Sequence, residues 1–216
     1  DRPLGAQRRP PDEHEVPGDD AVHAEARTVL ERLRGRQGAD ACGRAVSGAQ
    51  VRCTQTRHAF GFGSAVTADG ITGSAFTADE RTTYQRKIVE DFNIATLENH
   101  LKWPYWDSMN QKDMTEAAVD WLRARQLRVR GHNLVWPAWN NLPGWMRSYE
   151  HDPVMLENKV EEHIAEIAGR FAGKLEVWDV INEPFTNKDL LNILGQDIMA
   201  TWIKKTRAAD PTCPTY

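Results

Sequence analysis

The sequence lacks the features that identify several large classes of protein. No apolar run approaches the roughly 18–20 residues that a membrane-spanning helix needs. The charges almost balance, with 27 basic and 31 acidic residues, so the chain as a whole lacks the excess of positive charge that is typical of DNA- or RNA-binding proteins. We therefore expect neither a membrane nor a nucleic acid as a partner.

Cysteine is scarce, and its spacing argues against a metal centre. The three cysteines are Cys42, Cys53 and Cys213, and none belongs to a C-x-x-C pair. A structural zinc site needs about four ligands at close spacing. Neither G-x-G-x-x-G nor G-x-x-x-x-G-K-[ST] follows any apolar run. The sequence therefore predicts no metal and no cofactor.

Tryptophan is absent from the first 102 residues. All eight tryptophans lie between Trp103 and Trp202. An indole offers a broad apolar face and one N–H donor, which suits both a large core and stacking on sugar rings. We expect both uses in the second half of the chain.

The composition divides the chain into three parts. Residues 1–20 contain four of the 11 prolines, and we predict a disordered lead-in there because such a segment cannot bury a core. Residues 21–55 are predicted to form a short helix and a small β or irregular arm. Regular patterning begins near residue 56, and residues 56–216 are predicted to form one domain.

Expected strands and helices alternate through this third part. Short apolar runs predict the strands, and apolar residues spaced by three and four predict the helices. The strands are expected over 59–66, 93–97, 127–136 and 175–182. The helices are expected over 77–92, 113–125, 153–171 and 190–210. Thr77 and Glu80 have the form of a capping box, and Asp152 before Pro153 has the form of a helix start.

This alternation predicts an α/β fold with a parallel sheet and crossover helices. A doubly wound open sheet and a (β/α)8 TIM barrel both fit, and the missing nucleotide-binding motifs favour the barrel. A full barrel takes about 250 residues, so residues 56–216 hold only about the first four βα units. The residues after Pro211 are expected to open strand five, where the chain stops.

A carboxylate stands at the end of the fourth expected strand, which runs into Asn182, Glu183 and Pro184. In a βα barrel the active site lies at the C-terminal ends of the strands. A carboxylic acid that is partly desolvated and ringed by tryptophans would hold its proton as a general acid must. Asp179 shares the strand parity of Glu183 and is interpreted as a buried hydrogen-bonding group. The alternative is that Asn182 and Glu183 form a helix-capping turn.

The second and third expected strands also end in polar and aromatic residues. These are Glu98, Asn99, Lys102 and Trp103 after the second strand, and His132 and Trp136 at the third. A carboxylate, an amide and an ammonium group can bind vicinal hydroxyls while an indole stacks on a sugar ring. The alternatives are a solvated loop with a local Glu–Lys pair, and a structural histidine.

Taken together, these motifs resemble the N-terminal half of glycoside hydrolase family 10, the family of endo-β-1,4-xylanases. The matches are FGFGSA at 60–65, EN-x-x-KW at 98–103, GH-x-LVW at 131–136, WDVINE at 178–183 and AADP at 208–211. Several motifs in the family's order and spacing make this resemblance specific.

The resemblance implies a secreted, cofactor-free, retaining glycanase on a (β/α)8 barrel that cleaves β-1,4 bonds in xylan. By that likeness Glu183 is the catalytic acid/base. The sugar-binding residues would be Glu98, Asn99 and Lys102 on the glycone side, and His132, Trp136 and Asn182 at the cleavage subsite.

The sequence departs from the family pattern in three places. Pro137, Ala138 and Trp139 stand where many members have His-Ser-Gln, and Pro184 is more like the related family 5 cellulases and mannanases. The family's nucleophile is a Glu at the end of strand seven, a strand that this chain does not reach. Two alternatives follow: a related barrel glycanase acting on cellulose or mannan, or a catalytically incompetent remnant that only binds polysaccharide. We expect these 216 residues alone not to hydrolyse xylan at a useful rate.

Overall fold

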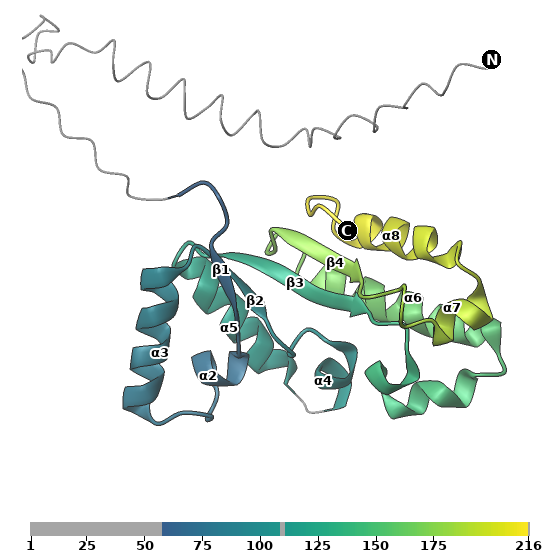
Figure 1. Ribbon diagram of the computed structural model, residues 1–216, viewed down its shortest axis with the longest axis horizontal. Coiled ribbons are helices and arrows are strands. Elements are labelled where there is room, and N and C mark those ends of the chain that lie inside the picture. Colours follow the sequence, from purple (N-terminus) through teal and green to yellow (C-terminus); the bar gives the residue numbers. More distant parts are fainter. Residues whose placement is uncertain (1–57, 109–110, 216) are drawn as a thin grey trace, which may run out of the picture. The chain divides into compact units, whose positions relative to one another are not determined.

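The computed structural model describes residues 58–108 and 111–215, so the expectations for residues 1–20 and 21–55 lie outside the described part. The compact unit that begins at Phe60 contains all of the named elements (Figure 1). Its strands are β1 (Gly63–Val66), β2 (Ile94–Leu97), β3 (Arg128–Val135) and β4 (Val177–Ile181). Its helices are α2 (Ala68–Thr72), α3 (Ala78–Asp91), α4 (Trp103–Ser108), α5 (Lys112–Ala124), η1 (Trp139–Asn141), η2 (Gly144–Tyr149), α6 (Pro153–Arg170), α7 (Asp189–Leu194) and α8 (Ile198–Ala209).

The four strands form one parallel sheet in the order β1-β2-β3-β4. Helices connect each strand to the next, as parallel pairing requires. Beyond α8 the chain returns to the free side of β4, where Thr215 forms a parallel bridge with Trp178. The main-chain N–H of Trp178 donates to the Pro214 carbonyl at 2.9 Å. The predicted α/β fold is confirmed, and this isolated bridge lies where the sequence analysis expects a fifth strand to begin.

Two helix starts follow the predicted capping chemistry. The Thr77 hydroxyl accepts from the Glu80 N–H, and the Glu80 carboxylate accepts from the Thr77 N–H at 3.0 Å, which completes the capping box of α3. Asp152 caps α6 by accepting from the Met155 N–H at 3.1 Å, with Pro153 at the first helical position. Both predictions are confirmed.

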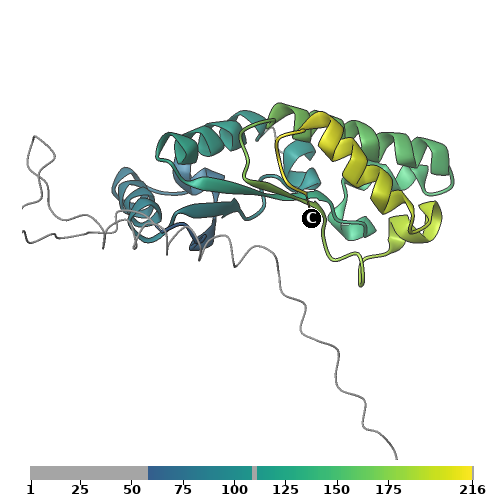
Figure 2. The same cartoon turned by 90° about the horizontal axis from the view of Figure 1, so that it is seen from above.

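The two faces of the sheet differ in their surroundings. Figure 2 shows α5 and α6 along one face. Alternate residues of the strands are buried in the hydrophobic core. They include Ala95, Leu97, Val129, Trp178 and Val180. The residues of opposite parity, which include Thr96, Arg130 and Asp179, are only partly buried. This second, more polar face is the one that carries the candidate site.

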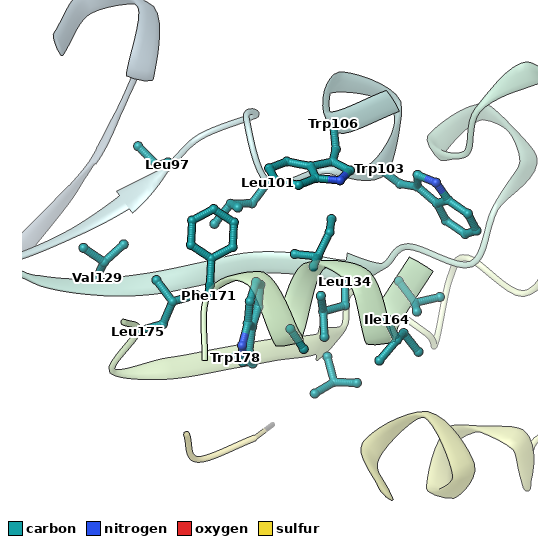
Figure 3. Close-up of a cluster of buried hydrophobic side chains, with 14 of the residues drawn as sticks. Leu97, Leu101, Trp103, Trp106, Val129, Leu134, Ile164, Phe171, Leu175 and Trp178 are labelled. Atoms are coloured by element: carbon teal, nitrogen blue, oxygen red, sulfur yellow. The ribbon is translucent and has the colours of Figure 1, made fainter. Parts of the chain in front are cut away.

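Aromatic rings fill the core between the sheet and its helices. Phe171, next to the end of α6, lies between Trp106 of α4 and Trp178 of β4, with ring centroids 5.7 and 6.5 Å away. Figure 3 shows these three rings among the surrounding aliphatic side chains. Trp106, Trp178 and Trp202 are fully buried. Part of the tryptophan content therefore serves the core, as the sequence predicts.

The expectation of one continuous helix over 190–210 is wrong. The chain instead forms α7 and α8 with a break at Gly195, whose φ of +81° lies in the left-handed region. The Gly195 N–H donates to the Leu191 carbonyl at 2.9 Å, which closes the end of α7. Glycine accepts this conformation without a Cβ clash, and it therefore ends the helix. The short helices α2 and α4 were not expected either.

Candidate active site

The predicted site residues gather at one edge of the sheet. Glu98 follows β2, Trp136 follows β3, and Asn182 and Glu183 follow β4, while His132 lies within β3. Because all four strands are parallel, their C-terminal ends meet at the same edge. The Asn182 N–H donates to the Val135 carbonyl at 2.8 Å and ties the ends of β3 and β4 together.

An open hollow of about 550 Å³ lies on the partly buried face of the sheet. Its walls contain three of the predicted sugar-binding residues, Glu98, Lys102 and His132. The remaining lining residues are Gly61, Gly63, Ser64, Ala65, Ile94, Thr96 and Arg130. Glu183, Asn182 and Trp136 are not among them. The hollow therefore belongs to the β1–β3 side of the site, and the predicted acid/base is not part of its walls.

Lys102 joins the groups that follow β2 to the indole that follows β3. Its ammonium group donates to the Asn99 side-chain oxygen at 2.9 Å and lies 5.2 Å from the ring centroid of Trp136. The second contact is within the range of a cation–π interaction. The Trp136 indole N–H is buried and has no hydrogen-bond partner in the described part of the chain. Asn99, Lys102 and Trp136 are thus brought together.

Asp179 lies at the centre of a charged network on the same face. Its Oδ2 is 2.7 Å from His132 Nδ1 and also accepts from the guanidinium of Arg130. Burial by itself raises the pKa of Asp179, but the hydrogen bond from His132 and the charge of Arg130 outweigh it and lower the pKa below its ordinary value. Asp179 thus forms the hydrogen bonds that the sequence analysis assigned to it, but it is partly buried and not fully buried as expected. Arg130 was not anticipated, although it shares strand parity with His132.

Glu183 does not occupy the partly desolvated position that the sequence analysis expected. The residue is exposed, and its φ is +48°. Its carbonyl accepts from the Thr186 and Asn187 main-chain N–H groups at 3.2 and 3.0 Å, so the chain turns sharply after β4. The alternative of a turn at this point is partly right, but no helix begins there, because α7 has Lys188 as its N-cap.

The described residues show neither of two other features. Within 58–108 and 111–215, no group of three or more His, Cys, Asp or Glu side chains is arranged to hold a metal ion. Among the same residues, no helix combines the length and the apolar character needed to cross a membrane.

Comparison with known proteins decides the family. A family model described as glycosyl hydrolase family 10 matches residues 54–216. The chain belongs to this family. Its solved members include an endoxylanase retrieved from a sugarcane soil metagenome, which superposes with a TM-score of 0.63 at 26% sequence identity over 72% of this chain and 47% of that one. Xylanase 10B from Thermotoga maritima superposes with a TM-score of 0.59 at 27% identity over 72% and 48%.

Two curated proteins are similar in sequence to parts of this chain. The endo-1,4-beta-xylanase 2 of Claviceps purpurea is 28% identical over 138 residues, which are 60% of this chain and 42% of that protein. The anti-sigma-I factor RsgI6 of Acetivibrio thermocellus is 33% identical over 182 residues, which are 82% of this chain and 22% of that protein. This family 10 chain spans less than half the length of each relative named here. Its fold is accordingly about half of the family's (β/α)8 barrel.

Proposed function

We propose that this family 10 chain is the acid/base-bearing half of an endo-1,4-β-xylanase that acts with retention of configuration. The observation that carries the proposal is Glu183, which follows β4 at the C-terminal edge of a family 10 sheet whose polar face carries a hollow lined by hydrogen-bonding side chains. The names of several relatives, including those of Claviceps purpurea and Thermotoga maritima, support xylan as the substrate.

In the proposed reaction, Glu183 donates its proton to the glycosidic oxygen as the C–O bond to the leaving sugar breaks. A second carboxylate attacks the anomeric carbon and forms a glycosyl-enzyme intermediate. Glu183, now ionised, takes a proton from water, which displaces the second carboxylate. Retaining glycosidases hold the two carboxyl groups about 5–5.5 Å apart. We propose that the second carboxylate comes from outside residues 58–108 and 111–215.

The other predicted site residues bind the sugar in this proposal. Glu98, Asn99 and Lys102 bind hydroxyl groups on the glycone side. His132, Trp136 and Asn182 line the cleavage subsite, where the indole offers an apolar face to the sugar ring. Xylan is too large to enter a cell, so the protein is proposed to act outside it, without a cofactor.

The departures from the family pattern keep a second substrate class open. Pro137, Ala138 and Trp139 alter the loop after β3, and Pro184 alters the turn after Glu183. A preference for cellulose or mannan would follow if these changes remodel the cleavage subsite. A panel of xylan, carboxymethyl cellulose and mannan, assayed side by side, distinguishes the substrate classes. Binding of polysaccharide without release of product would favour a binding protein.

The decisive test compares the chain alone with a complemented chain, in which the C-terminal half of Thermotoga maritima xylanase 10B is fused after Tyr216. We expect the complemented chain to release xylo-oligosaccharides and the chain alone to release none at a useful rate. E183Q should abolish the activity of the complemented chain, because a glutamine cannot transfer the proton. E176Q, at the opposite end of β4, is the matched control and should retain it. Release of product by the chain alone, dependent on Glu183, would contradict the need for a second half.

A further inference from the structure

The carboxylate of Glu183 is held by a side chain that no sequence motif identified. Asn187 Nδ2 donates to Glu183 Oε2 at 3.2 Å and lies 3.3 Å from the Glu183 carbonyl oxygen. The Asn187 main-chain N–H also donates to this carbonyl, at 3.0 Å. One asparagine therefore contacts both the backbone and the carboxylate of the proposed acid/base, four residues along the same turn.

The orientation of the Asn187 amide is set by a second asparagine. Asn141, at the end of η1, donates from Nδ2 to Asn187 Oδ1 at 3.2 Å. With its oxygen engaged in this way, the Asn187 amide presents its NH₂ group to Glu183. A flipped amide would place an oxygen against an ionised carboxylate and an NH₂ group against the NH₂ of Asn141, and it would lose both hydrogen bonds.

The two loops that carry these asparagines are joined at further points. The main-chain N–H of Trp139 donates to the Asp189 carboxylate at 2.8 Å, and the main-chain N–H of Leu190 donates to the Pro137 carbonyl at 3.1 Å. The loop after β3 therefore supports the turn after β4 through backbone contacts as well as through Asn141. This supporting loop is the segment in which Pro137, Ala138 and Trp139 replace the family pattern.

We propose that Asn187 is a positioning residue for Glu183, held in orientation by Asn141, and that it directs the transferable proton to Oε1. The proposal rests on the acid/base role of Glu183 in the proposed function. An amide N–H can donate to Oε2 whether the carboxyl group is ionised or protonated, because a carbonyl-type oxygen accepts in both states. The proton is therefore carried by the oxygen that the amide leaves free.

This arrangement serves both halves of the reaction with one geometry. In the first half, Oε1–H gives its proton to the glycosidic oxygen while Oε2 keeps its bond to Asn187. In the second half, a lone pair of Oε1 takes the proton from the attacking water. Because Glu183 is exposed, its side chain would otherwise sample many rotamers, and a catalytic acid must be held within hydrogen-bond reach of the reacting oxygen.

The contact itself can be tested in the full chain without any assay of activity. In proton–nitrogen correlation spectra, the side-chain NH₂ signals of Asn187 should shift with pH as Glu183 titrates. The shift should disappear in E183Q. Asn192, which is exposed on α7, is the internal control and should not respond. A pH-independent Asn187 signal, or the same shift in E183Q, would overturn the proposal.

The kinetic consequence can be tested in the complemented chain with aryl β-xylobiosides, measured as kcat/KM because this constant reports the steps up to leaving-group departure. N187A should lower kcat/KM about tenfold or more for a phenyl leaving group, which needs its proton, and less than about twofold for 2,4-dinitrophenyl, which does not. N141A should show the same pattern more weakly, and N192A should match the parent. An equal fall with both leaving groups, or none, would overturn the proposal.

If the complemented chain were inactive on xylan, the proposed function would fail, while the spectroscopic result would still decide the contact.

Discussion

His132 and Asp179 are direct partners across two strands, paired in the register of β3 and β4 and joined by a hydrogen bond of 2.7 Å from Nδ1 to Oδ2. Because the lowered pKa of Asp179 keeps its carboxylate ionised at neutral pH, that carboxylate accepts the Nδ1 proton. Nε2 of His132 is thereby left as the nitrogen that can meet a ligand in the hollow. Only 19% of the His132 side chain and 14% of the Asp179 side chain are exposed, so water competes weakly for this bond.

The first prediction concerns the stability that this network provides. D179N removes the charge that Arg130 and His132 face, and it should lower the free energy of unfolding at pH 7 by about 1–3 kcal/mol. E176Q is the matched control. Glu176 directly precedes β4 and forms a partly exposed ion pair with Arg128, so its loss should change stability by less than about 1 kcal/mol. Urea unfolding of both variants measures the difference.

The pH dependence of the same variant has a definite sign. A carboxyl group whose pKa is lowered by folding contributes stability above its unfolded pKa, and this contribution is lost as the pH falls through the lower, folded pKa. The difference between the parent chain and D179N should therefore be constant near neutral pH and shrink below about pH 4. A difference that grows on acidification would contradict the assignment.

The second prediction concerns His163, which is buried and donates from Nε2 to the Leu134 carbonyl at 3.1 Å while its ring stacks on Trp103. Burial lowers the pKa of His163 to about 3. The His163 side chain of the unfolded chain becomes protonated below about pH 6.5. Between pH 6.5 and 3 the unfolded state therefore binds more protons than the folded state. The free energy of unfolding falls as the pH falls through this range, by up to about 1.4 kcal/mol per pH unit. H163Q should show a shallower slope by that amount. Equal slopes between pH 6 and 4 would show that His163 is not the group responsible.

The third prediction contrasts two glycines. A Cβ on Gly131 would lie 2.3 Å from Cε3 of the fully buried Trp178, so G131A should destabilise the fold by about 1–3 kcal/mol or more through overpacking. A Cβ on Gly169, in α6, meets nothing within 4 Å, and G169A should stabilise by about 0.5–1 kcal/mol because alanine favours helix. Thermal unfolding should thus move in opposite directions for the two variants, and a similar shift for both would refute the packing argument.

The fourth prediction concerns the reactivity of Cys213, which is 5% exposed. Burial raises the pKa of its thiol to about 12, and the thiolate is the reactive form. In a chain carrying C42S and C53S, Ellman's reagent should label Cys213 slowly in buffer and at the rate of a free thiol in urea. The triple variant with C213S gives the background. Rapid labelling in buffer would mean that the loop after α8 opens readily.

The sequence predicts the regular elements well because their signals are local. Apolar runs mark the four strands, and hydroxyl or carboxylate caps mark the starts of α3 and α6. The helix break at Gly195 is hidden because Leu191, Leu194 and Ile198 keep a helical spacing across it. Only the conformation of the glycine separates α7 from α8, and a glycine inside a periodic segment does not by itself reveal that conformation.

The site is only partly predictable for a related reason. Residues at strand ends, such as Glu98 and Glu183, can be located because parallel strands end at one edge. Arg130 could have been found from its parity with His132, since both then face Asp179 on the next strand. Asn141 and Asn187 belong to no periodic pattern. The turn after β4 brings Asn187 to Glu183, and only the packing of two loops brings Asn141 to Asn187.

The strand order β1-β2-β3-β4 follows the order of synthesis, and each strand pairs with the one made immediately before it. As the chain leaves the ribosome, every new strand finds its partner already present, and only the two or three helices between consecutive strands have to be accommodated. Loops of this length close at modest entropic cost. The sheet can therefore grow vectorially, one βα unit at a time, with the newest strand always at the growing edge.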